Sequence, residues 1–162
     1  MMSRAHGLVA LALLAILIGQ ATAGEDAVIL LVCEHGSVKS LIAAALFNKK
    51  ADERKLPFHA IARGVSPDAQ VPPKIAEALV REGFSVAGFR PAAVSNDDVA
   101  RAIHIVAIGV EAASLPRDRR VQVEQWDDVP AASVDYAASH NSLERHVSAL
   151  LDRLARERQL PH

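Results

Sequence analysis

Short apolar runs, typical of buried strands, alternate along this chain with segments whose apolar residues recur at helical spacing. The runs predict strands over residues 27–32, 58–62, 103–109 and 120–125, the last of them less buried. The helical spacing predicts helices over residues 40–50, 72–82 and 142–158, and a short helix that a Ser95 cap begins and Arg101 ends. Strands that alternate with helices favour an α/β fold: three layers, doubly wound, with a four-stranded parallel sheet and helices on both of its faces.

The N-terminal residues differ in character from the rest of the chain. Arg4 precedes an apolar core over residues 8–18, and residues 21–23, Ala-Thr-Ala, then place small side chains where a cleavage site needs them. The core is short for a membrane span. We therefore expect a signal peptide over residues 1–23 and one domain over residues 24–162. The protein would then be exported, periplasmic or extracellular, with no stable membrane insertion after cleavage; an uncleaved anchor is the alternative.

Charge and composition narrow the range of partners. The formal net charge is −1 and aromatic residues make up 4% of the chain, so neither a basic patch nor a stacking surface predicts binding to nucleic acid. The one cysteine cannot form a disulfide within the chain. A disulfide between two copies is allowed, which leaves the oligomeric state open. His104, His140 and His146 lack the spacing of a metal site, and we expect no metal and no cofactor.

Residues 33–40, Cys-Glu-His-Gly-Ser-Val-Lys-Ser, carry the strongest indication of chemistry. They contain Cys33 and lie between the first predicted strand and the first predicted helix. A tight turn there directs backbone N–H groups and the positive end of the helix dipole at one place. A thiol at that place favours its thiolate form, and an oxyanion binds beside it. The segment predicts a nucleophile that acts on a phosphate-like anion; a buried cysteine without chemistry is the alternative.

The spacing Cys-x5-Lys-Ser resembles Cys-x5-Arg-Ser/Thr, the phosphate-binding loop of the low-molecular-weight protein tyrosine phosphatases and the related arsenate reductases. The likeness covers most of residues 27–157. Segments similar to those of the family follow the loop in order: Ala62-Arg63-Gly64-Val65, then Ala76-Glu77-Ala78-Leu79 with Gly83-Phe84-Ser85, then residues 91–98, and last Trp126-Asp127-Asp128-Val129-Pro130 near the place of the family's Asp-Pro loop.

The resemblance implies a role for each residue of the site. Cys33 would attack phosphorus as a thiolate and form a phosphocysteine. Ser40 would donate a hydrogen bond to the sulfur, and Asp128, or alternatively Asp127, would protonate the leaving group and then activate water. The residues between the cysteine and the serine would hold the anion: Glu34, His35, Gly36, Ser37, Val38 and Lys39. Structural alternatives are a solvated lysine, a helix cap at the serine and turn residues at the two aspartates.

Three loop positions depart from the family pattern. Lys39 replaces an arginine, so one mobile point charge stands where the family has a planar fork that grips two oxygens. Gly36 replaces an asparagine that often braces the loop. Glu34 adds a negative charge that opposes both thiolate formation and anion binding. These changes should weaken catalysis and leave the fold intact.

The sequence therefore predicts a phosphatase of the low-molecular-weight tyrosine phosphatase type, whose partner is a phosphorylated substrate or a free oxyanion. One alternative is a thiol-dependent arsenate reductase, which would need an external thiol because the chain has no second cysteine. Another is a catalytically impaired module that binds anions or senses redox state. The substrate itself is not predicted.

Overall fold

The computed structural model describes residues 26–118 and 120–159. The predicted signal peptide over residues 1–23 lies outside the described residues and stays a prediction. Within the described ranges, no helix combines the length and the apolar character that crossing a membrane requires.

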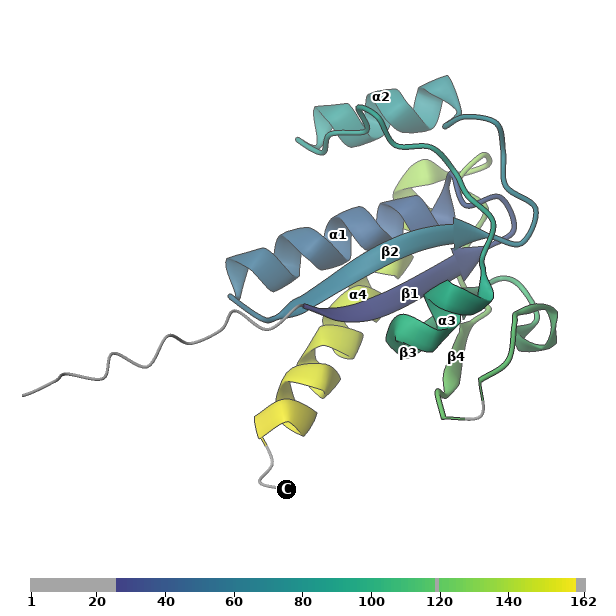
Figure 1. Ribbon diagram of the computed structural model, residues 1–162. Helices are drawn as coiled ribbons and strands as arrows, with labels where there is room; N and C mark the ends of the chain where they lie inside the picture. The colour runs from purple at the N-terminus through teal and green to yellow at the C-terminus, as the bar shows by residue number, and fades with distance from the viewer. Residues whose placement is uncertain (1–25, 119, 160–162) are drawn as a thin grey trace, which may run out of the picture.

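Strands and helices alternate along the described chain, and Figure 1 shows one sheet with helices packed against it. The elements are, in order, β1 (Ala27–Cys33), α1 (Lys39–Glu53), β2 (Phe58–Gly64), α2 (Pro73–Arg81), α3 (Asn96–Arg101), β3 (Ala102–Ile108), the 3₁₀ turn η1 (Ala112–Ser114), β4 (Val123–Trp126) and α4 (Tyr136–Gln159).

The four strands form a parallel sheet in the order β2-β1-β3-β4. β1 pairs along its length with β2, from Ala27 opposite Phe58 to Cys33 opposite Gly64, and on its other side with β3. A strand between two neighbours, with both of its faces covered, reads as an uninterrupted apolar run. The predicted four-stranded parallel sheet is therefore confirmed.

Helices cover both faces of this sheet and make three layers. On one face α1, α2 and α4 bury the larger core, whose members include Phe47, Leu79 and Leu150. On the other face α3 contributes Val99 to a smaller core, and Leu115 joins it from the segment after η1. The predicted three-layer α/β fold is confirmed, and its loops place β1, β2 and β3 with their carboxyl ends at one edge.

The longest helix begins earlier than its apolar spacing indicates. The prediction placed its start at Ser142, whereas α4 begins at Tyr136. The Asp135 side chain accepts a hydrogen bond from the Ala138 amide at 2.9 Å and caps the helix there. This cap precedes the first fully apolar turn, so hydrophobic spacing alone does not reveal it.

The last strand begins later than predicted, at Val123 rather than at Arg120. The Arg120 guanidinium donates to the Asp118 carboxylate at 2.6 Å, and the amide of Val121 donates to the Asp118 carbonyl at 3.2 Å. These contacts hold Arg120 and Val121 against Asp118, so the first residues of the predicted strand lie outside the sheet.

The predicted Ser95 cap of α3 is confirmed. Its hydroxyl accepts a hydrogen bond from the Asp98 amide at 3.1 Å, and the Asp98 carboxylate accepts one from the Ser95 amide at 3.1 Å. The same carboxylate accepts two bonds of 3.0 Å from the Arg63 guanidinium. Burial raises the pKa of Asp98, but the bonds from Arg63 and Ser95 outweigh it and the net pKa is lowered.

Candidate active site

Cys33 stands at the carboxyl end of the central strand. It is the last residue of β1, it lies opposite Gly64 of β2, and α1 begins six residues later at Lys39. Functional groups of open parallel α/β sheets gather at this edge. The thiol is buried, with 4% of the residue exposed, and it lines a cleft of about 1330 Å³.

Two backbone amides and one hydroxyl converge on the Cys33 sulfur. The Ser40 hydroxyl lies 3.1 Å from it, the Gly36 amide donates to it at 3.3 Å and the Ser40 amide donates to it at 3.4 Å. No side chain caps the N-terminus of α1, so the sulfur accepts one of the amides that a helix start leaves unpaired. A neutral thiol is a weak acceptor, whereas a thiolate gains from each donor. The two amides therefore point at the sulfur as they would at a bound anion.

The loop after Cys33 is braced by the segment that follows β2. Its first three carbonyl groups each accept a backbone hydrogen bond from that segment: Cys33 from Val65 at 3.0 Å, Glu34 from Ser66 at 2.8 Å, and His35 from Asp68 at 3.1 Å. With these carbonyl groups directed at the second segment, the loop keeps one shape.

Gly36 makes this close approach feasible. Its φ is +67°, in the left-handed region that favours glycine, and an added Cβ would lie 2.8 Å from the amide nitrogen of Gly64. A Cβ on Gly64 would likewise lie 2.7 Å from the nitrogen of Gly36. Two glycines facing one another let the backbones touch, which places the Gly36 amide on the sulfur.

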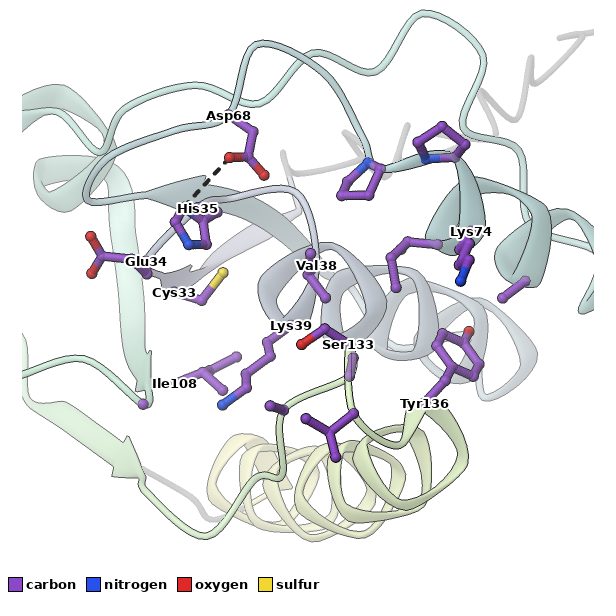
Figure 2. A pocket seen from close by; sticks show the side chains of 18 of the residues that line it. Cys33, Glu34, His35, Val38, Lys39, Asp68, Lys74, Ile108, Ser133 and Tyr136 are labelled. Carbon is purple, nitrogen blue, oxygen red and sulfur yellow. Dashed lines mark ion pairs between the residues drawn. The ribbon is translucent and has the colours of Figure 1, made fainter.

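Lys39 lines the cleft, but its amine is hydrogen-bonded to a residue that is not part of the cleft lining. Its Nζ donates to the carbonyl oxygen of Val129 at 2.8 Å, in the segment between β4 and α4. The amine also lies beside Gly109, where an added Cβ would be 3.1 Å from it. In Figure 2 the side chain extends past Ile108, away from the loop that begins at Cys33. The cation therefore fastens the β4–α4 segment to the start of α1.

The two predicted acids, Asp127 and Asp128, are exposed and are not among the residues that line the cleft. Asp128 Oδ1 lies 2.7 Å from Nε2 of His146 on α4. The hydrogen bond from His146 holds the pKa of the Asp128 carboxyl below its usual range. The His146 ring in turn stacks on the buried Trp126, with 4.7 Å between centroids. Asp128 is thus paired with α4, and its role as general acid, like that of Asp127, stays a prediction.

A different carboxylate lines the cleft. Asp68 accepts a hydrogen bond from the Ser37 hydroxyl on Oδ2, and its Oδ1 lies 3.5 Å from Nδ1 of His35. Sequence reasoning missed Asp68, which lies in the turn after β2. Parallel strands end at the same edge of a sheet, so a carboxylate that closely follows β2, the neighbour of β1, is expected near Cys33. This position after a strand was the signal that could have identified Asp68.

The remaining predicted loop residues are placed as follows. Glu34 lines the cleft, and in Figure 2 its carboxylate points away from the Cys33 sulfur. Val38 also lines the cleft, just before the first residue of α1. Along residues 26–118 and 120–159, no group of three His, Cys, Asp or Glu side chains is arranged to hold a metal ion.

His104 and His140 are paired within the fold. His104 Nε2 lies 2.9 Å from Glu124 Oε2, and His140 Nε2 lies 3.1 Å from Glu82 Oε2. Trp126 donates its indole N–H to Glu124 at 2.9 Å and is 1% exposed. These residues belong to the packing of α2, α4 and the sheet, and they leave Cys33 and the groups around it as the candidate site.

The family model described as low molecular weight phosphotyrosine protein phosphatase matches residues 28–160. The chain belongs to this family. No functionally curated protein matches the sequence. The family has Arg where this chain has Lys39, so the chain is a divergent member of a superfamily that also includes arsenate reductases.

Solved structures with the same fold come from both branches of the superfamily. A low molecular weight phosphotyrosine phosphatase of Vibrio cholerae O395 is 18% identical, with a TM-score of 0.70, over 83% of this chain and 99% of the other. An arsenate reductase of Archaeoglobus fulgidus is 25% identical, with a TM-score of 0.62, over 76% and 98%. A thioredoxin-dependent arsenate reductase of Corynebacterium glutamicum is 16% identical, with a TM-score of 0.70, over 83% of this chain and 65% of the other.

Proposed function

We propose that this chain is a phosphomonoesterase that acts through a phosphocysteine at Cys33. The observation that carries the proposal is the convergence of two donating amides, at 3.3 and 3.4 Å, and of the Ser40 hydroxyl, at 3.1 Å, on the sulfur. Donors placed in this way stabilise a sulfur that acts as a nucleophile. Membership of the phosphatase family supports the choice of phosphorus as the atom attacked.

The cleft supports a substrate larger than inorganic phosphate. Its volume of about 1330 Å³ exceeds the roughly 300–1,000 Å³ of common small-molecule sites. It extends from Cys33 along α2 to the start of α4, where Ile75, Val134 and Tyr136 line it. A phosphate ester could place its phosphoryl group at the sulfur and its organic part against these side chains.

We further propose export of the mature chain, which N-terminal sequencing of secreted protein would test.

A second candidate is an anion-binding module without turnover. The bond from Lys39 Nζ to the Val129 carbonyl favours it, because the cation expected on the phosphoryl group is held by the protein itself. Loss of one donor to the transition state lowers turnover by about a hundredfold or more. Both candidates require an oxyanion at the loop, and they differ in whether the sulfur becomes phosphorylated.

The test is hydrolysis of p-nitrophenyl phosphate under reducing conditions, with mass spectrometry of acid-quenched protein to detect phosphocysteine. We expect turnover that Cys33→Ser abolishes and that Lys39→Arg raises about tenfold or more, because the guanidinium fork can bond two phosphoryl oxygens at once. The matched control is Lys49→Arg, an exposed position on the same helix, which should change nothing. Absence of turnover in every variant, with phosphate still protecting Cys33 from alkylation, would replace the phosphatase by the anion-binding module.

A further inference from the structure

His35 and Asp68 form a pair at the mouth of the cleft that the preceding reaction does not use. His35 Nδ1 lies 3.5 Å from Asp68 Oδ1, and both residues line the cleft together with Cys33. In Figure 2 the imidazole lies between the Asp68 carboxylate and Cys33. A carboxylate beside one ring nitrogen favours a proton there and sets the ring orientation. The second nitrogen, Nε2, is then the one that can exchange a proton with a ligand.

Asp68 is itself fixed to the loop it would serve. The Ser37 hydroxyl donates to its Oδ2, and its own amide donates to the His35 carbonyl at 3.1 Å. The carboxylate therefore keeps its place relative to the imidazole, although the His35 side chain is 56% exposed. At this exposure, water and substrate can reach the ring.

The reaction proposed for Cys33 needs a proton donor, and the late aspartates are poorly placed for that task. Neither Asp127 nor Asp128 lines the cleft, and the hydrogen bond from His146 favours the ionised form of Asp128. Of these candidate groups, His35 is the one that lines the cleft, two residues from the nucleophile. Histidine is also the side chain that most often gives and takes protons near neutral pH.

We propose that His35 is the general acid and base of the reaction at Cys33, and that Asp68 positions it; this inference rests on the proposed function. The thiolate attacks phosphorus, the S–P bond forms, and the P–O ester bond breaks as protonated His35 gives its Nε2 proton to the leaving oxygen. Neutral His35 then takes a proton from water while the water oxygen attacks phosphorus. The S–P bond breaks, and thiolate, inorganic phosphate and protonated His35 result.

The experiment compares two substrates whose leaving groups differ in their need for a proton. Phenyl phosphate must release a phenol, whereas 2,4-dinitrophenyl phosphate releases a stable anion. The quantity compared is kcat/KM, which reports the steps up to phosphorylation of Cys33 and not the later hydrolysis of the phosphocysteine, in which His35 acts as base for both substrates. His35→Gln should lower kcat/KM for phenyl phosphate by about a hundredfold, within the range expected for loss of a general acid. For the dinitrophenyl ester, kcat/KM should fall less than tenfold. The control is His59→Gln, an exposed histidine near the opposite end of β2, which should leave both rates unchanged.

A second pair of variants separates catalysis from folding. Free imidazole should restore turnover of phenyl phosphate to His35→Ala, because the solute supplies the missing proton donor. Asp68→Asn should lower kcat/KM for phenyl phosphate more than for the dinitrophenyl ester, as a positioning residue would. Equal losses of kcat/KM on both substrates, with no rescue by imidazole, would overturn the inference and leave Cys33 chemistry standing. A wild-type protein that fails to hydrolyse the dinitrophenyl ester through Cys33 would overturn the proposed function as well.

Discussion

Replacing Ser40 by alanine should slow the reaction of Cys33 with an alkylating reagent at pH values where the thiol form predominates. The Ser40 hydroxyl is fully buried, 3.1 Å from the sulfur and 3.2 Å from the carbonyl oxygen of Arg63. Beside a neutral thiol the hydroxyl can donate to Arg63 while it accepts the S–H. Beside a thiolate it can turn and donate to sulfur. Alanine removes this adjustable donor and leaves the two backbone amides.

The size of the effect follows from the two hydrogen bonds between which the Ser40 hydroxyl can choose, one to the thiolate and one to the Arg63 carbonyl. A hydrogen bond to a charged group contributes about 1.5–3 kcal/mol, and a neutral one, here to Arg63, about 1 kcal/mol. The difference is close to 1.4 kcal/mol, so wherever the thiol form predominates in both proteins the variant has about a tenfold smaller thiolate fraction. The remaining thiolate is more basic and therefore more nucleophilic, with a Brønsted coefficient of roughly 0.4–0.5. These opposing effects leave the alkylation rate about threefold lower in that pH range.

The assay measures iodoacetamide alkylation of Cys33 by mass spectrometry from acidic to alkaline pH. Once both proteins are fully ionised, the more basic thiolate of Ser40→Ala should react about threefold faster, so the two rate profiles cross. The control is Ser142→Ala, a buried serine of α4 whose hydroxyl has no hydrogen-bond partner within the described residues. Profiles that coincide, or that stay parallel without crossing, would refute the role given to the Ser40 hydroxyl.

Two further predictions concern the scaffold of the site. Asp98→Asn should lower the free energy of unfolding at pH 7 by about 3 kcal/mol, because it leaves the Arg63 guanidinium without its partner. Since the pKa of Asp98 is lowered in the folded protein, this contribution to stability is present above roughly pH 4 and is lost as the pH falls through the folded pKa. The free energies of unfolding of the two proteins, measured in urea, should therefore converge in acid. A difference in stability that stays constant with pH would contradict the role given to the Asp98 carboxylate. Gly36→Ala should lower stability by about 2–3 kcal/mol, from positive φ and contact with Gly64 together, whereas Gly88→Ala, with φ +75° and no atom within 4 Å, should show only the strain of about 1–2 kcal/mol. Equal losses in the two glycine variants would show that the contact with β2 contributes nothing.

The sheet and the position of the thiol could be predicted because both depend on local hydrophobic spacing. A strand covered on both faces reads as a continuous apolar run, so β1 and its last residue, Cys33, are visible in the sequence. The turn and the helix that follow are equally local. The starts of α4 and β4 were misplaced because a side-chain cap and a turn, rather than apolar spacing, determine them.

Side-chain partners could not be predicted, because they are chosen by packing between distant segments. Lys39 reaches the carbonyl of Val129, which is 90 positions away, and nothing local indicates that bond. Ser37 meets Asp68, 31 positions later, only because β2 lies beside β1. Asp128 was assigned to the site from its position near Pro130, whereas its actual partner lies on α4.

The departures from the family pattern affect different parts of the site. Where the family often has a bracing asparagine, Gly36 lets the loop press directly against Gly64, and Ser37 and Asp68 add a side-chain brace. Loop rigidity is therefore retained by other means, and the donors on the sulfur keep their positions. Lys39 has no such replacement, because its amine is bonded to the β4–α4 segment. Binding of an oxyanion should thus persist in this chain. Turnover should be limited by the lack of a positive charge on the phosphoryl group in the transition state.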